Sequence, residues 1–102
     1  MSGSSMDGLD ICYCNLQFTD NKVQYKILKS QTNPFPNDII TKLQRILQMS
    51  VLEFSLFDRQ FGAWIGEQVN TFITSNSIKD LDYVASHGHT VLHQTDKKLT
   101  VQ

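Results

Sequence analysis

Apolar and polar residues alternate along the first third of the chain, and a helical spacing replaces that alternation in the middle third. Residues 9–19 follow the two-residue period of a half-buried strand, as do residues 23–28. The residues between these runs, Thr19 to Lys22, have the composition of a tight turn. The pattern therefore predicts an antiparallel hairpin of two strands joined by a short loop.

A segment that breaks regular structure separates this hairpin from the first predicted helix. Pro34 and Pro36 force extended backbone on the residues before them. Asn37 has a side chain suited to capping a helix. Apolar residues at helical spacing then predict a helix from residue 39 to residue 48, with its polar residues on the opposite face.

A second, longer helix is predicted by the same spacing over residues 57–73, ending before Ser75–Ser77. Its beginning, between residues 49 and 55, is ambiguous. Gly62 and Gly66 lie four residues apart and hence on one face of this helix. Because glycine inside a helix costs about 1 kcal/mol, the pair predicts close packing there, against another helix or, less favoured, a substrate.

The last part of the chain adds short apolar runs. Tyr83–Ala85 has the composition of a buried parallel strand, and residues 91–93 with residues 99–101 predict a final hairpin. The order strand, strand, helix, helix, strand, hairpin indicates an α/β fold, a mixed sheet with packed helices. We expect one domain, residues 1–102.

The composition is typical of a globular protein. Of 102 residues, 40% are hydrophobic and 19% are charged, with a net charge of -1. No basic cluster provides an electrostatic footprint for nucleic acid or an acidic membrane. No apolar run is long enough to span a bilayer, and the first residues do not resemble a secretion signal, so the cytoplasm is the expected location.

Cys12 and Cys14 lie two residues apart in the first predicted strand. Their side chains then point the same way, with geometry poor for a disulfide bond. A single Cys-x-Cys is weak evidence of a metal site. We expect two cysteines that face the core.

Small, hydroxylated and acidic residues gather at the start of the first strand, and they are Gly3, Ser4, Ser5, Met6, Asp7, Gly8, Leu9 and Asp10. A glycine-containing turn can point several backbone N–H groups at one anion. Carboxylates beside a phosphate require a divalent cation. The segment lacks the P-loop and dinucleotide-binding patterns. Composition alone favours two other interpretations, an expression-tag scar at the N-terminus and a hairpin turn at Asp7-Gly8.

A second polar segment, Ser86 to Thr90, follows the predicted strand at residues 83–85. Ligands bind at the carboxyl ends of strands in open α/β sheets. Polar contacts to a substrate, and hydrogen bonds that fix the loop, are both consistent with this composition. His87, His89 and His93 have no recognised zinc spacing, so a metal site is disfavoured. Nothing in the chain forms a convincing nucleophile–base pair.

Both polar segments resemble motifs of one family. Met1-Ser2-Gly3-Ser4-Ser5-Met6-Asp7-Gly8-Leu9-Asp10 resembles the phosphate motif of the anhydro-N-acetylmuramic acid kinases, Met-Ser-Gly-Thr-Ser-x-Asp-Gly-x-Asp. Ser86-His87-Gly88-His89-Thr90-Val91 resembles their Ser-His-Gly-Gln-Thr-Val segment. The helix that includes Asp58 to Gly66 lies where the family has a similar amphipathic helix. The resemblance covers essentially the whole chain, in the right order.

The resemblance implies the N-terminal part of a cytoplasmic sugar kinase with a ribonuclease H-like fold, that of the actin-like ATPases. Such kinases use ATP and Mg²⁺ to convert 1,6-anhydro-N-acetylmuramic acid to its 6-phosphate in cell-wall recycling. Carried over, residues 3–10 would hold the nucleotide phosphates, with Asp7 and Asp10 near the metal. Substrate contacts would come from His87, Gly88, His89 and Thr90.

The chain departs from the family pattern in ways that bear on activity. Ser4 replaces threonine and keeps a hydroxyl, whereas His89 replaces glutamine and offers a donor and an acceptor in another shape. Family proteins are several times longer, and their catalytic aspartate and adenosine-binding loops lie in later segments. Both ends of the chain look cut. We therefore expect no catalytic residue here and an inactive fragment, because phosphoryl transfer needs several parts together.

Two alternative functions follow from the residues themselves. A chain with an exposed sheet edge could be a non-catalytic binding or self-assembling module, so a homodimer is kept as a partner hypothesis beside the sugar substrate. A small metal protein that uses the three histidines is the other alternative.

Overall fold

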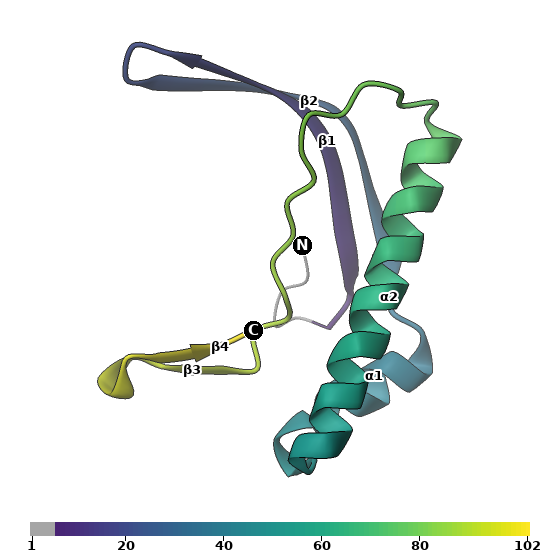
Figure 1. The fold of residues 1–102 in the computed structure, drawn as a ribbon, viewed down its shortest axis with the longest axis vertical. Coiled ribbons are helices and arrows are strands. Elements are labelled where there is room, and N and C mark those ends of the chain that lie inside the picture. Colours follow the sequence, from purple (N-terminus) through teal and green to yellow (C-terminus); the bar gives the residue numbers. More distant parts are fainter. Residues whose placement is uncertain (1–5) are drawn as a thin grey trace.

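One long hairpin and one long helix make up most of the structure, a computed structural model that describes residues 6–102 (Figure 1). The elements in chain order are β1 (Gly8–Thr19), β2 (Lys22–Pro34), α1 (Asn37–Gln44), the 3-10 turn η1 (Ile46–Gln48), α2 (Val51–Ser75), β3 (Leu92–Gln94), the 3-10 turn η2 (Thr95–Lys97) and β4 (Leu99–Val101). The predicted combination of helices and strands is confirmed.

The hairpin of β1 and β2 is the predicted antiparallel pair, with Asn21 at positive φ in its turn. Its second strand is longer than predicted, because residues 29–34, which are polar apart from Pro34, continue the ladder against the first half of β1. The register shifts between Tyr13 and Cys14, which pair with Lys29 and Ile27. Leu28 is therefore an extra residue in β2, a bulge that bends the hairpin.

Helix α1 begins after a proline rather than after a polar cap. Pro36 is its N-cap residue, no side-chain hydrogen bond caps the helix, and Asn37 is already its first residue. The expectation that Asn37 is the cap is therefore wrong. The helix also ends at Gln44, before the predicted residue 48, and a short 3-10 turn follows it.

A capping box sets the start of α2. The Ser50 hydroxyl accepts from the backbone N–H of Glu53, and the Glu53 carboxylate accepts from the backbone N–H of Ser50 over 2.8 Å. The expected close packing at Gly62 and Gly66 is wrong. A Cβ atom at either position would have no neighbour within 4 Å, because both glycines lie on an exposed part of the helix.

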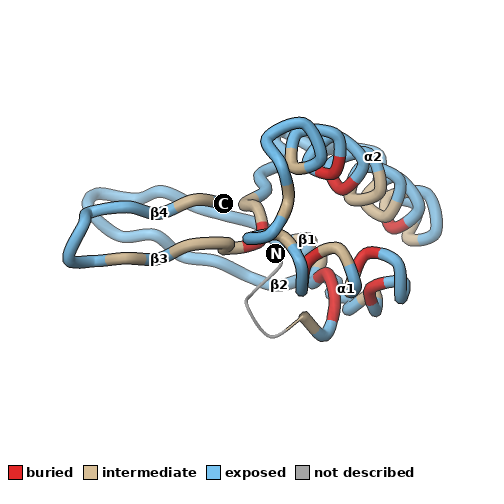
Figure 2. Tube along the Cα trace, turned by 90° about the horizontal axis from the view of Figure 1, so that it is seen from below, coloured by how far each residue is buried: buried red, intermediate tan, exposed pale blue. Residues whose placement is uncertain are grey.

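The core lies where α1 and α2 meet the beginning of the hairpin (Figure 2). The buried apolar side chains are Leu9, Phe35, Ile39, Leu43, Phe57, Phe61 and Phe72. Phe35 contacts both Phe61 and Trp64, with ring centroids 5.8 and 5.5 Å apart. The aromatic cluster joins the end of β2 to the middle of α2.

The expectation of a mixed sheet is wrong for the part of the chain that the structure describes. There β1 pairs with β2, β3 pairs with β4, and both pairs are antiparallel. Tyr83–Ala85 is not a strand, and Tyr83 is 90% exposed. A three-residue apolar run forms a strand only beside another strand, and neither sheet extends to it. The final hairpin, by contrast, is confirmed.

The expectation that Cys12 and Cys14 face the core is wrong. Both thiols are free, and both side chains are exposed rather than facing the core. Core positions on β1 belong to Leu9 and Ile11, which lie on the other face of the strand. Among residues 6–102, no helix is both long and apolar enough to cross a membrane.

Candidate functional site

The first predicted site lies where β1 begins. Gly3, Ser4 and Ser5 fall outside the described residues, so only the second half of the predicted phosphate turn, Met6 to Asp10, has a described position. Met6 has positive φ, Asp7 lies in a bend, and the strand starts at Gly8. The side chain of Leu9 is in the core, at 2% exposure, so it is a packing residue.

Gly8 has a structural reason to be glycine. A Cβ atom there would lie 2.5 Å from the carbonyl oxygen of Asn33, the β2 residue that pairs with the neighbouring Leu9. Asn33 is itself held, because its side-chain amide donates to Gln68 of α2 over 2.9 Å. The glycine therefore allows β1 to approach β2 closely at the point where the turn enters the sheet.

Asp7 and Asp10 are the two predicted metal ligands, and both side chains are exposed. The Asp10 carboxylate accepts a hydrogen bond of 2.6 Å from the hydroxyl of Thr32, directly opposite in β2. In residues 6–102, no three His, Cys, Asp or Glu side chains gather as a metal site. One or two carboxylates completed by phosphate oxygens and water suit Mg²⁺, however, and the chemistry of this pair fits that ion.

The second predicted site, His87 to Thr90, lies in the irregular segment between α2 and β3, so the strand expected before it is missing. His87 and Gly88 are joined by a hydrogen bond, in which Nδ1–H of His87 donates to the Gly88 carbonyl over 2.9 Å. Thr90 accepts from the side-chain amide of Gln102 over 3.3 Å. Hydrogen bonds within the segment therefore shape the loop.

His89 is the buried polar side chain of this segment, at 8% exposure. With Gly88 it lines a cavity of about 260 Å³ whose opposite wall is α2. That wall contains Phe57, Phe61 and the exposed residue Asp58. An imidazole and a carboxylate beside aromatic rings can offer both hydrogen bonds and apolar contact to a small polar molecule.

Asp58 was not predicted as a site residue. The only signal in the sequence is its position between Phe57 and Phe61, the residues that form the buried stripe of α2. An acidic residue beside such a stripe is common on solvated helices, and nothing in the pattern shows that residues 88–91 return to this part of α2.

The two predicted segments meet the same part of α2. Leu9 packs in one cluster with Phe57 and Phe61, and His89 lines the cavity whose wall is formed by the same two rings. Figure 1 shows the segment after α2 returning toward the end of the hairpin where β1 begins. The third histidine, His93, is exposed and hydrogen-bonded to Thr100 of β4 over 3.0 Å. The structure does not bring the three histidines together as a metal site.

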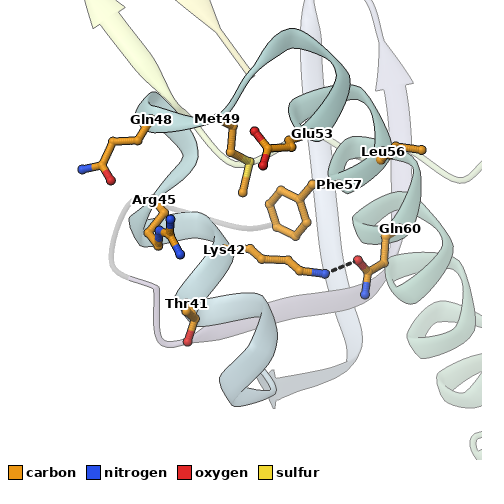
Figure 3. Close-up of a pocket in the computed structure, with 9 residues that line it drawn as sticks. All are labelled: Thr41, Lys42, Arg45, Gln48, Met49, Glu53, Leu56, Phe57 and Gln60. Carbon is orange, nitrogen blue, oxygen red and sulfur yellow. Dashed lines mark hydrogen bonds between the residues drawn. The ribbon is translucent and has the colours of Figure 1, made fainter.

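A second hollow, of about 320 Å³, lies between α1 and α2 (Figure 3). Sequence reasoning did not predict it. The Lys42 ammonium group donates to Gln60 over 2.5 Å and lies 5.7 Å from the centre of the Phe57 ring. Because the Lys42 contacts join α1 to α2, this hollow belongs to the packing of the two helices.

The one thiol with a shifted pKa lies on β1. Partial removal from water, then the charge and hydrogen bond of the Cys14 thiol, raise the pKa of Cys12 above its ordinary value of 9.0. A thiol with a raised pKa is a poor nucleophile at neutral pH. Cys12 therefore does not suit catalysis.

Comparison with known proteins identifies one family. The model of the anhydro-N-acetylmuramic acid kinase family matches residues 1–102. A kinase of that name from Francisella tularensis subsp. novicida is 27% identical over 96% of this chain, and one from Pseudoalteromonas translucida is 30% identical over 91%. These alignments cover 27% and 24% of the relatives themselves. The chain spans about a quarter of the length of the curated relatives that it matches.

Proposed function

The chain belongs to the anhydro-N-acetylmuramic acid kinase family, and from that premise we propose that it is the N-terminal part of a sugar kinase. In the proposed reaction, which belongs to cell-wall recycling, water adds to C1 of 1,6-anhydro-N-acetylmuramic acid and breaks its anhydro bond. The 6-oxygen released from that bond takes the γ-phosphoryl group of ATP, which gives N-acetylmuramic acid 6-phosphate and ADP. The match of the family model to all 102 residues carries this proposal. A ribonuclease H-like domain, completed by segments beyond these residues, is part of it.

Residues 3–10 are proposed to face the nucleotide phosphates. Gly8 supports this placement, because β1 and β2 lie so close together there that a side chain would not fit where the turn enters the sheet. Asp7 and Asp10 are proposed to hold Mg²⁺, which neutralises charge on the phosphates during transfer. The Thr32 hydroxyl, which donates to Asp10, orients that carboxylate.

His87 to Thr90 are proposed to contact the sugar. The cavity beside His89 supports this role, because sugars bind through polar groups together with aromatic surface, and both line it. Asp58 joins the proposed contacts from the opposite wall. The internal hydrogen bonds of His87 and Thr90 would hold the loop in place for His89.

The 102 residues alone are proposed to be inactive. Phosphoryl transfer depends on positioning and charge stabilisation by several parts acting together. Within residues 6–102, the arrangement offers a carboxylate pair and a cavity but no convincing base for an attacking water. With ATP, Mg²⁺ and the anhydro sugar, the isolated chain should therefore give no phosphorylated product, and measurable turnover would contradict this.

A chimaera tests the kinase assignment. Residues 1–102 would replace the matching segment of the Francisella relative, and ATP-dependent phosphorylation of the anhydro sugar would be measured. We expect turnover, and Asp10→Asn should raise the Mg²⁺ concentration for half-maximal rate about 10- to 100-fold, the range for disturbed metal ligation. Asp20→Asn, at the far tip of the hairpin, is the matched control and should change neither value.

Two results would contradict these proposals, the first the kinase assignment and the second the metal role of Asp10. One is a chimaera that keeps the circular dichroism spectrum of the relative but has no turnover. The other is an Asp10→Asn variant with the Mg²⁺ dependence of the unmodified chimaera, which would remove the metal role while leaving the family assignment unaffected.

A further inference from the structure

Cys12 and Cys14 lie side by side on one exposed face of β1. Because successive residues of a strand point to opposite faces, these two share a face, and Leu9 and Ile11, which pack into the core, lie on the other. Both thiols are free and exposed. From this placement we propose that the pair is a binding site for one soft cation, Cu⁺, a role separate from the proposed kinase function.

The spacing of the two thiols suits a bridging ion better than a disulfide bond. A strand rises about 3.3 Å per residue, so the Cα atoms of alternate residues lie about 6.6 Å apart, near the upper limit for a disulfide. A disulfide would also draw the sulfur atoms together to about 2.05 Å. With metal–sulfur bonds of about 2.3 Å, the value for zinc, an ion between the sulfur atoms holds them about 4.6 Å apart. The two thiols already lie near enough to interact through charge and a hydrogen bond.

The number of ligands selects the kind of ion. Structural zinc takes four ligands, and iron–sulfur clusters take four thiolates. Within residues 6–102, however, no third His, Cys, Asp or Glu side chain joins a group that could hold a metal. Cu⁺ is soft, prefers sulfur ligands and is stable between two of them in a line. Two thiols without a third ligand therefore fit Cu⁺ and fit zinc poorly.

The binding step exchanges protons for the metal and involves no redox change. Each thiol gives its proton to the solvent, two copper–sulfur bonds form, and copper remains in its singly charged state. The residues opposite the two cysteines in β2 are Ser30 and Ile27, which carry no charge that would compete for the thiolates.

The same face of the hairpin keeps this ion apart from the proposed Mg²⁺ site. Asp10 precedes Cys12 by two residues, and its carboxylate accepts from the hydroxyl of Thr32. Mg²⁺ takes oxygen ligands, whereas Cu⁺ takes sulfur. Each ion should therefore keep its own ligands, and millimolar Mg²⁺ should not displace Cu⁺.

Competition with the coloured Cu⁺ chelator bathocuproine disulfonate, without oxygen, measures the affinity of the 102-residue chain. We expect one Cu⁺ per chain by native mass spectrometry, with or without millimolar Mg²⁺. Cys12→Ser and Cys14→Ser should each raise the dissociation constant at least about 100-fold, the gain expected when two linked groups bind one ion. His93→Ser, which removes an exposed imidazole, is the matched control and should leave the constant unchanged.

Two further variants separate the shared face from the mere presence of two thiols, and both start from Cys12→Ser. Adding Leu16→Cys places a thiol two residues from Cys14 on the same face, and tight binding should return. Adding Asn15→Cys places it on the opposite face, and binding should stay weak. Thermal melting by circular dichroism would show that the variants fold.

Four results would overturn the proposal. They are one Cu⁺ shared between two chains, displacement of Cu⁺ by millimolar Mg²⁺, single-serine variants that bind as tightly as the unmodified chain, and equal binding by the Leu16→Cys and Asn15→Cys variants.

Discussion

At the scale of single residues, contact with the neighbouring strand explains Gly8 without any ligand. A side chain at this position would meet the Asn33 carbonyl, and Asn33 cannot easily move because Gln68 of α2 holds its amide. The same glycine is part of the motif that resembles a phosphate turn. The two explanations are compatible, because a turn can wrap an anion only if the strand behind it is fixed.

Replacing Gly8 with alanine should destabilise the chain. We expect the free energy of unfolding to fall by about 1–3 kcal/mol, the usual cost of an overpacked site. Gly62→Ala is the control and should raise it by about 1 kcal/mol, because no atom lies within 4 Å of the new methyl group and alanine favours the helix. Urea titration followed by Trp64 fluorescence measures both. Equal stability of Gly8→Ala and the unmodified chain would contradict the contact.

Cys12 should react slowly with alkylating reagents at neutral pH. Its raised pKa keeps the thiol protonated, and one of the causes is Cys14. Cys14→Ala should therefore lower the pKa of Cys12 and speed its alkylation, although the pKa should stay above 9.0 because desolvation remains. The measurement is the pH dependence of the alkylation rate. An unchanged profile in Cys14→Ala would exclude coupling between the thiols.

The residue scale also shows how far the sequence could define the site. The motifs marked residues 3–10 and 87–90. Of the described residues among them, Leu9 packs in one cluster with Phe57 and Phe61, and Gly88 and His89 line a cavity with the same two rings. The pattern did not identify Asp58, whose partners come from a segment about thirty residues later in the chain. Contacts of that kind depend on how irregular segments return to a helix, and hydrophobic periodicity carries no information about this.

At the scale of elements, prediction succeeded where a local signal was sufficient. The hairpin from residue 9 and the middle of α2 follow from periodicity alone. The start of α2 was left ambiguous, although a local signal was present in Ser50 and Glu53, three residues apart, which form the capping box. The inner half of β2 had none, because its polar residues become a strand only through pairing with β1.

The capping box gives α2 a pH-dependent contribution to stability. Hydrogen bonds from the side chain and backbone of Ser50, and then the charge of Arg45, lower the pKa of Glu53 below its ordinary 4.5. Because the folded-state pKa is the lower one, this contribution is present above pH 4.5 and is lost as the pH falls below that value.

Ser50→Ala should therefore lower the free energy of unfolding at neutral pH by about 1 kcal/mol, the usual value of an N-cap. The difference from the unmodified chain should shrink as the pH falls below 4.5. Ser55→Ala, whose hydroxyl bonds the backbone within the helix, is a control without a cap. Urea titrations at a series of pH values measure the effect. A Ser50→Ala difference that is constant down to low pH would contradict a role for the Glu53 carboxylate.

At the scale of the whole molecule, the chain is more open than its length requires. Its radius of gyration is 16.0 Å, whereas a compact domain of this length has about 13 Å. Only seven apolar side chains are buried among residues 6–102, and the outer hairpin projects beyond them (Figure 2). An open shape of this kind leaves apolar surface for further contacts, as expected if these residues are a quarter of a larger kinase.

Small-angle X-ray scattering tests that shape. We expect a radius of gyration close to the 16.0 Å of the structure, in which the tip of the hairpin extends away from the helices (Figure 1). A value near the about 13 Å of a compact chain would show that the hairpin folds back onto α2 in solution.

The single extra residue Leu28 sets the direction of the outer half of the hairpin, residues 14–27, which is called the arm below. Removing Leu28 would keep the pairs Tyr13–Lys29 and Cys14–Ile27 but eliminate the extra residue that bends the ladder. The arm would then leave the helices along a straighter course, with each side chain still paired as before. A single in-frame codon deletion could therefore redirect the arm during evolution without altering the chemistry of its surface.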